Sequence, residues 1–460
     1  MNARDVSALE VRRGYGRSLR SATPRLSLAA LSERPHGYDP IARLLEQGST
    51  RVQALLPLRY QRMLESPLAF FRGSALLMAD DLARGASTSL EVQLCGDAHL
   101  SNFGVFSSPE RQMVFDVNDF DETEVGPFEW DVKRLTASLA IASQQLAHNA
   151  RQQEAIALAA AREYRSAMAR FALQTRLEVW YAALDLDSVM IDLEGFFSGG
   201  ARRKIYDVVQ DAKGRVTVDA FSKVLVYGDH GPTIAVNPPH FTRLAEGEDA
   251  SLGASDVFEI VAGYGETLSS DRQVLLKQFS VRDTARHVVG VGSVGTECFA
   301  VLLVGRDDRD PFLLQIKEAQ ESVLALARGL GETFEPGERV VRGQKLMQAT
   351  PDVFLGWHTT QFADRRRSFY IRQLYDNRAS VDVERLDESS LVAYGRLCAW
   401  TLARAHARTG RGAEIAGYLG KGDRFDESMA AFALAYRDRN QGDYEALKSE
   451  VGRGGITVAT

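Results

Sequence analysis

Two short polar segments in the first third of the chain carry residues suited to phosphoryl chemistry. Residues 95–103 read CGDAHLSNF, and residues 117–121 read VNDFD. Transfer of a phosphoryl group from ATP requires a carboxylate that positions the acceptor hydroxyl, and oxygen ligands for the Mg²⁺ that bridges the phosphates. Asp97 is suited to orient the acceptor, while Asn102 and Asp119 are suited to hold the metal. We therefore predict a catalytic loop followed by a metal loop.

Neighbouring residues leave alternatives open at both loops. Asp116 and Asp121 are rivals of Asp119 for the metal, or share its role. His99 is more typical of a hydrogen-bonding residue beside a site than of a lone metal ligand. The acids and the amide also suit the caps of turns, a purely structural role in which Asp and Asn are common.

A glycine-rich segment lies much later in the chain. Residues 290–295 read GVGSVG, a GxGxxG pattern that is a weak signal on its own. Glycines let the backbone approach phosphates and direct N–H groups at them. A dinucleotide-binding turn would run into a helix, whereas residues 298–304 and 312–317 are strand-like and are separated by a turn. We predict a β-hairpin whose phosphate contacts are Gly290, Gly292, Ser293 and Gly295.

The first two loops resemble those of the protein-kinase-like superfamily, in particular aminoglycoside and choline phosphotransferases, whose loops read like GDxHxxN and DFD or DFE. The resemblance implies that Asp131, at the end of the segment GPFEWD, buttresses the catalytic loop. Cys95 departs from the pattern, because many relatives carry His there. The resemblance also favours a small molecule over a protein as the acceptor.

The glycine segment and the strand after it resemble the small lobe of the same superfamily. Lys317, a lone charge among apolar residues, then corresponds to the catalytic lysine that grips the α- and β-phosphates. Glu338 is the expected carboxylate partner of Lys317, with Glu321 as a rival. Residues 370–375 would form the last strand of the lobe and lead to adenine contacts at Gln373 and Leu374.

The order of these motifs differs from that of ordinary kinases, in which the glycine segment and the lysine come first. Here residues 402–407, LARAHA, resemble a kinase helix that normally precedes the catalytic loop, yet they follow it. Joining the present ends restores the usual order, which predicts a circular permutation within the large lobe. The arrangement over roughly residues 40–440 resembles the bacterial family called domain of unknown function 2252.

Hydrophobic patterns predict an α+β fold with two lobes. We expect helices at 66–82, 130–189, 338–348 and after 387, and strands at 89–94, 105–106, 113–117, 287–291, 298–304, 312–317, 353–357 and 368–374. Residues 196–250 have no readable pattern. The predicted organisation is an Arg-rich solvated leader (1–35), a large lobe in two parts (36–274 and 386–460) and a small nucleotide-binding lobe (275–385).

Composition narrows the class of protein. The chain has 460 residues and a formal net charge of −6, so no overall basic field attracts nucleic acid or an anionic membrane. Three widely separated cysteines build neither a disulfide framework nor a CxxC metal pattern. No apolar run is long enough to span a membrane. We predict a cytoplasmic protein without nucleic-acid or membrane partners.

These residues together predict an ATP- and Mg²⁺-dependent phosphotransferase that acts on a hydroxyl of a small molecule. A catalytically inert nucleotide- or partner-binding module of the same fold is the main alternative. Nucleotidyl transfer stays open, because some kinase-like folds perform it. A metallophosphoesterase is disfavoured, because the chain has no GNH[DE] segment to complete a two-metal centre.

Overall fold

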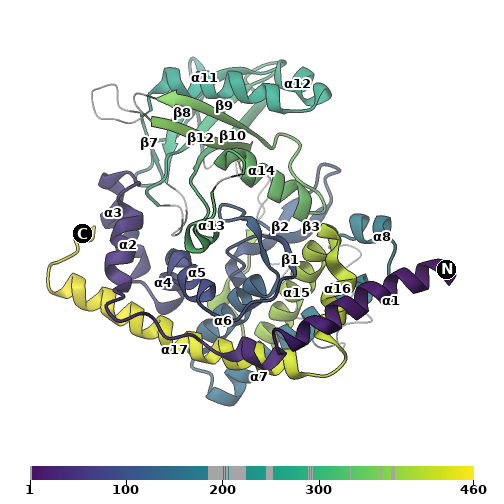
Figure 1. Ribbon diagram of the computed structural model, residues 1–460. Coiled ribbons are helices and arrows are strands. Elements are labelled where there is room, and N and C mark those ends of the chain that lie inside the picture. The colour runs from purple at the N-terminus through teal and green to yellow at the C-terminus, as the bar shows by residue number, and fades with distance from the viewer. Residues whose placement is uncertain are drawn as a thin grey trace.

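A small β-rich lobe lies above a larger, mostly helical lobe (Figure 1). The chain is therefore an α+β protein, as predicted. The computed structural model describes residues 3–184, 200, 203, 206, 224–244, 252–288, 290, 292, 294–331, 333–362, 365–374 and 379–459. In these residues, no helix is both long and apolar enough to cross a membrane.

An antiparallel sheet of six strands in the order β11-β12-β10-β9-β8-β7 forms the small lobe. These strands are β7 (Phe241–Thr242), β8 (Ser280–His287), β9 (Cys298–Val304), β10 (Pro311–Ala319), β11 (Gly356–Phe362) and β12 (Arg365–Gln373). β9 is apolar throughout because both of its faces are buried. Its Phe299 and Val301 pack with α11 (Ala254–Tyr264), whereas Ala300 and Leu302 pack with β5 (Leu225–Gly228) and β6 (Gly231–Ile234).

The small lobe begins earlier than the predicted residue 275. β5, β6, β7 and α11 all belong to it, although the sequence suggested that they were part of the large lobe. Two of its strands are also shifted from their predicted positions. β8 precedes the apolar run at 288–291, and β11 follows the one at 353–355, because both strands carry many polar residues that hide their pattern.

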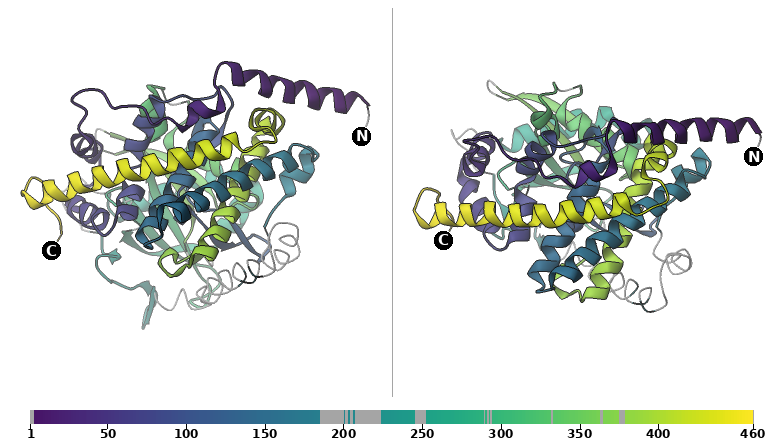
Figure 2. Two further views of the ribbon diagram at one scale, coloured as in Figure 1. Left: turned by 90° about the horizontal axis from the view of Figure 1, so that it is seen from below. Right: turned by 60° about the horizontal axis from the view of Figure 1, so that its bottom comes forward.

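Four long helices form the body of the large lobe. They are α6 (Glu129–Gln145), α7 (Ala150–Phe171), α15 (Glu388–His406) and α17 (Arg424–Gly452). α6 is buried on every side from Glu129 to Ser143, as expected of a central helix. Figure 2 shows α17 crossing the underside of the lobe, and it packs on both α6 and α7.

Two small sheets position the polar loops above these helices. β1 (Glu91–Leu94) pairs with β4 (Glu124–Pro127), and β2 (Phe103–Ser107) pairs with β3 (Met113–Val117) and β13 (Ala379–Ser380). β2 and β3 are completely buried, which fixes the hairpin between the two predicted loops. The predicted catalytic loop follows β1, and the predicted metal loop follows β3.

Four short helices form the front of the large lobe. They are α2 (Pro40–Gly48), α3 (Leu56–Met63), α4 (Pro67–Gly73) and α5 (Ala75–Ala83). Asp39 and Ser66 cap α2 and α4 through the backbone N–H groups of Ile41 and Ala69, and a proline follows each cap. The predicted helix at 66–82 is thus two helices separated at Ser74. The other α-helices in the described part of the chain are α1 (Ala3–Ser18), α8 (Arg176–Tyr181), α12 (Ser270–Leu276), α13 (Val323–Arg328), α14 (Pro336–Met347) and α16 (Gly412–Leu419).

The expected solvated leader is wrong for its described part, because α1 packs on α16. Arg12 forms an ion pair of 2.9 Å with Glu414. The two helices approach so closely that a Cβ at Gly417 would lie 2.3 Å from the carbonyl oxygen of Arg13. The two ends of the described chain lie on opposite sides of the large lobe (Figures 1 and 2). Circular permutation stays a prediction, and joining the two described ends would require a segment that crosses the large lobe.

The contact between α1 and α16 predicts the effect of Gly417→Ala. At an open helical site the change would stabilise the helix, because glycine loses more backbone freedom on folding than alanine does. Here the clash with Arg13 should lower the free energy of unfolding by about 1 to 3 kcal/mol, measured by urea denaturation. Gly442→Ala is the matched control, because Gly442 lies inside α17 and its Cβ would meet no atom within 4 Å. Equal stability of both variants would mean that α1 is not docked.

Candidate functional site

A buried carboxylate holds the backbone of the predicted catalytic loop. Gly96 has φ 84° and would place a Cβ 2.0 Å from the carbonyl oxygen of Glu122, so only glycine fits this turn. Asp131, in the first turn of α6, accepts hydrogen bonds from the N–H groups of Cys95 (2.9 Å) and Gly96 (3.0 Å). His406 of α15 lies 3.1 Å from the same carboxylate. The buttressing role expected of Asp131 is confirmed.

Asp97 projects from this loop beside a buried guanidinium. The Nε of Arg134 donates to its Oδ1 at 2.7 Å, and Asn102 donates to its backbone carbonyl at 2.7 Å. Burial raises the pKa of Asp97, and Arg134 opposes that shift. Burial, Arg72 and Arg134 hold the pKa of His99 well below its usual range. His99 is therefore neutral at physiological pH.

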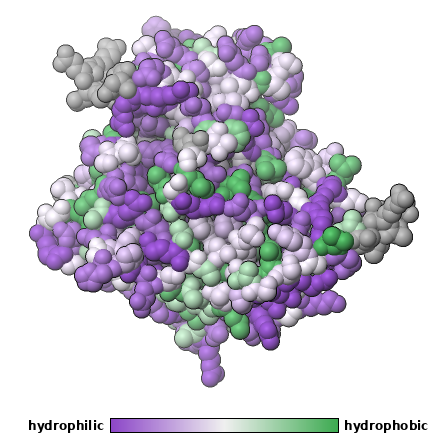
Figure 3. Space-filling view, viewed as in Figure 1, coloured by the Kyte–Doolittle hydropathy of each residue, from purple (hydrophilic) through white to green (hydrophobic). Residues whose placement is uncertain are grey.

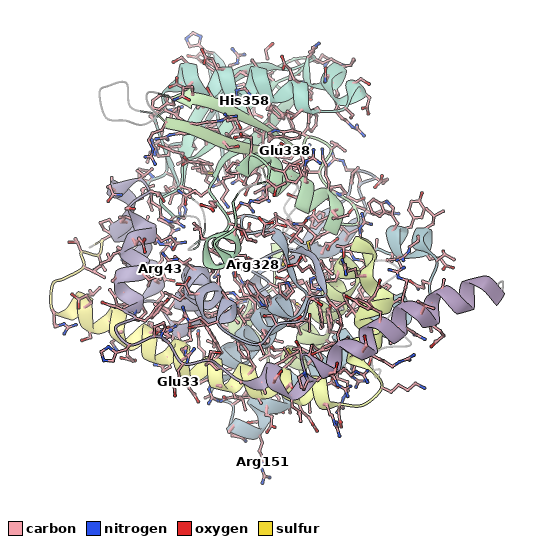
Figure 4. All side chains as sticks on the ribbon, viewed as in Figure 1. Glu33, Arg43, Arg151, Arg328, Glu338 and His358 are labelled. Carbon is pink, nitrogen blue, oxygen red and sulfur yellow. The ribbon has the colours of Figure 1, made fainter. Side chains whose placement is uncertain are left out.

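Asp121 joins the metal loop to the small lobe. Its carboxylate accepts hydrogen bonds from Lys317 of β10 and from the hydroxyl of Tyr370 of β12, the latter at 2.7 Å. Burial opposes ionisation of this carboxyl, but Lys317 and Tyr370 lower its pKa to about 2. The predicted partnership of Glu338 with Lys317 is wrong, because Glu338 pairs with Arg342 at 2.7 Å on α14 (Figure 4).

Asp119 has a different environment from Asp121. Among the described residues it has no ion pair, and its one hydrogen bond comes from the N–H of Asp121 at 3.2 Å. Burial and the neighbouring Asp121 raise the pKa of Asp119. Both side-chain oxygens of Asp121 are already engaged, so the structure favours Asp119 over Asp121 as the carboxylate available to a metal.

The predicted loops converge on one cavity of about 190 Å³, here called the inner pocket. It brings together six predicted site residues, namely Asp97, Asn102, Asp119, Gly290, Gly292 and Lys317. Four further residues complete its lining, namely Arg72, His99, Gln315 and Arg372. Sequence reasoning missed Arg72 and Arg372 as site residues. The available signal was the same for both, a single arginine inside an apolar run, as in LAFFRGSALL and FYIRQL.

Three other predicted contacts lie elsewhere. Gly295 is in the left-handed region at φ 94°, and its carbonyl accepts from Val52 at 2.7 Å. Leu374 packs in the core of the sheet, and its N–H donates to Leu313 at 2.9 Å. The N–H of Gln373 donates to Asp352, and neither Gln373 nor Leu374 lines the inner pocket. Ser293 lies outside the described residues.

The front helices hold the glycine segment over the pocket. Arg51 donates to the carbonyls of Gly292 (3.1 Å) and Val294 (2.8 Å). Arg59 of α3 donates to the same carbonyl of Gly292 at 2.8 Å and to that of Gly73 at 2.6 Å. Both arginines are buried, so these hydrogen bonds are shielded from water.

A second cavity of about 620 Å³, the outer chamber, opens beside the inner pocket. A small space of about 40 Å³, the neck, lies between them, since it shares Asp121 and Glu122 with the outer chamber and Asp97 and Asp119 with the inner pocket. Apolar residues gather over α13 on the face seen in Figure 3. Leu326 of α13 is exposed and lines the outer chamber. The outer chamber, the neck and the inner pocket all include Gly292 of the glycine segment in their lining.

Glu122, between the neck and the outer chamber, gives a pH-dependent prediction. Burial raises the pKa of this carboxyl to about 7, although it accepts a hydrogen bond from the N–H of Val323 at 2.8 Å. The folded state therefore binds the proton more tightly than the unfolded state, and the protein loses stability as the pH rises from about 4.5 to about 7.

Glu122→Gln should remove this loss. Its free energy of unfolding relative to the parent should increase across the same pH range, by on the order of 3 kcal/mol, in urea titrations at fixed ionic strength. Glu321→Gln, at another carboxylate of the outer chamber, is the control. A difference between parent and Glu122→Gln that is independent of pH would contradict the raised pKa.

The comparisons with known proteins identify a family and nothing more specific. No curated protein and no solved structure matches the chain. The family described as an uncharacterized protein conserved in bacteria (DUF2252) matches residues 51–450, which include all residues that line the inner pocket. The chain belongs to this bacterial family.

Proposed function

We propose that the protein is an ATP- and Mg²⁺-dependent phosphotransferase that acts on a hydroxyl of a small molecule. The observation that carries the proposal is the convergence of two distant segments on one pocket. Lys317 of the small lobe pairs with Asp121 of the large lobe, while Asp97, Asn102 and Asp119 line the same cavity under the glycine segment.

The charges of the inner pocket suit a chain of phosphates. Lys317, Arg372 and Arg72 bring positive charge to it, and Gly290 and Gly292 let the backbone come close. Lys317 is only 3% exposed, and its pKa is raised by Asp119 and Asp121 against the effect of burial. It therefore stays charged throughout the physiological range, as a phosphate-binding lysine must.

The donor set fits Mg²⁺ bound together with a nucleotide. Among the described residues, no three His, Cys, Asp or Glu side chains converge as an all-protein metal site. Mg²⁺ in nucleotide sites commonly takes one or two protein oxygens and completes its shell with phosphate oxygens and water. Asp119 and Asn102 offer such oxygens, and Asp119 lacks an ion pair among the described residues. The bound ion would neutralise charge that develops on the phosphates.

The transfer step follows from the position of Asp97. Its carboxylate orients the acceptor hydroxyl, whose oxygen forms a bond to the γ-phosphorus while the bond from that phosphorus to the β,γ-bridging oxygen breaks. ADP leaves, and the hydroxyl proton passes to Asp97 and then to solvent. Arg134 holds one carboxylate oxygen at 2.7 Å, which fixes the orientation of Asp97. The reaction is mostly positioning and charge stabilisation.

The outer chamber supplies the place for the acceptor. Its volume of about 620 Å³ suits a small molecule, and the neck leads from it to Asp97. Its lining mixes carboxylates, guanidinium groups and amides with apolar side chains, which suits a polar hydroxylated compound. On this assignment the small lobe and the two loops correspond to a permuted protein-kinase-like fold, and the three buried free cysteines agree with the reducing cytoplasm.

Asp119→Ala should abolish Mg²⁺-dependent binding of ATP, because the carboxylate is the principal metal ligand. Thermal stabilisation by ATP with Mg²⁺, which follows from binding to the folded state alone, should disappear in this variant. Glu154→Ala, which removes an exposed carboxylate of α7, is the control and should behave like the parent. Unchanged stabilisation of Asp119→Ala by ATP would contradict the metal assignment.

Asp97→Asn should spare nucleotide binding and reduce turnover by about 10²- to 10⁴-fold, because the amide cannot accept the proton of the acceptor. Slow hydrolysis of ATP, with water as the acceptor, is the readout that needs no known substrate. A parent protein that binds ATP but transfers nothing, to water or to a panel of polyhydroxylated compounds, would favour the inert binding module. Equal rates in parent and Asp97→Asn would remove Asp97 from the reaction.

A further inference from the structure

Arg72 lies in the last turn of α4 and lines both the inner pocket and the neck. It has no hydrogen bond and no ion pair with any other described residue. Its Nε is shielded from solvent and remains without a partner. A guanidinium carries five N–H donors, and leaving even one of them unpaired away from water is costly.

Each of the other cations of the site already has a protein partner. Lys317 donates to Asp121, Arg372 donates to Gln315 (3.1 Å) and to the carbonyl of Asn118 (3.1 Å), and Arg134 donates to Asp97. Burial lowers the pKa of Arg72, and Asp97 and Asp119 oppose the shift without contacting it. Arg72 is therefore the cation of this pocket that is left for an external anion, as far as the structure describes the chain.

The backbone around Arg72 is fixed relative to the glycine segment. Arg134 donates to the carbonyl of Phe71 at 2.7 Å, and Arg59 bridges the carbonyls of Gly73 and Gly292. A Cβ at Gly292 would lie 3.3 Å from the carbonyl oxygen of Arg72, so the two segments are in close contact. This support holds the guanidinium at the junction of inner pocket and neck.

A simpler role accounts for only part of this placement. An arginine in the last turn of a helix interacts favourably with the helix dipole, typically by 0.3 to 1 kcal/mol. A side chain turned to solvent would gain the same energy without desolvating its Nε. The orientation into the pocket therefore needs a second reason.

We propose that Arg72 binds the terminal phosphoryl group of the nucleoside triphosphate. The inference rests on the proposed function and extends it with a catalytic residue that touches the group in transfer. The junction of inner pocket and neck is where a γ-phosphoryl group must pass from the phosphates toward an acceptor beside Asp97. Two parallel N–H donors of a guanidinium match two phosphoryl oxygens and stabilise their charge in the transition state.

The test compares ATP with ADP, each with Mg²⁺, by isothermal titration calorimetry. Arg72→Ala should weaken the binding of ATP by at least about tenfold and the binding of ADP by less than about threefold, because only ATP carries the γ-phosphoryl group. Arg72→Lys should fall between, since it keeps the charge and loses the planar fork. Arg151→Ala, at an exposed arginine of α7 far from both cavities, is the control (Figure 4).

The outcomes separate this inference from the function on which it rests. A parent protein that binds neither ATP nor ADP removes the proposed function and this role with it. If the parent binds both nucleotides, and Arg72→Ala weakens the binding of ATP and of ADP equally or leaves both unchanged, the role of Arg72 is overturned while the proposed function stands. If Arg72→Ala does not fold, the ratio of the ATP and ADP affinities in Arg72→Lys decides, and a ratio equal to that of the parent counts against the inference.

Discussion

The ion pair between the buried Lys317 and the partly buried Asp121 is the constraint on which the arrangement of the two lobes depends. An isolated buried charge is expensive, so removing either partner would leave the other uncompensated. Tyr370 adds a hydrogen bond to the same carboxylate, which helps to satisfy it. Because Lys317 lies on β10 and Asp121 on the predicted metal loop, the pair sets the distance between the sheet and that loop. The glycine segment, Asp119 and Asn102 take their positions around that fixed point.

The ion pair also explains why the carboxyl groups of Asp121 and Asp119, two residues apart in sequence, have pKa values shifted in opposite directions. Asp121 is neutralised by Lys317 and kept ionised, whereas Asp119, two residues earlier, is buried near a like charge and is more easily protonated. Asp116 is different again, since it pairs with Arg404 and accepts from the N–H of Ala349 at 3.0 Å. Three acids within six residues thus serve the lobe junction, the pocket and the core of the large lobe.

Sequence reasoning succeeded where one local pattern determines the structure. β3 and β9 have the predicted bounds, and the predicted loops meet, because continuous apolar runs and strand-end acids leave few choices. It failed where tertiary contacts decide. The partner of Lys317 is a loop aspartate rather than Glu338, and no local signal distinguishes them. The start of the small lobe was missed because β5 and β6 are short and lie beside a segment without periodicity.

The hydrogen bonds from Arg51 and Arg59 to Gly292 have a consequence for motion. In a two-lobed protein the moving bodies are commonly assigned by lobe, but here α3 belongs to the lower lobe and is hydrogen-bonded to a segment of the upper lobe. Widening of the cleft must either break these shielded bonds or carry α3 upward with the sheet. The boundary between rigid bodies would then run through the front helices, and hinge residues should be sought after α3 rather than only at the ends of the sheet.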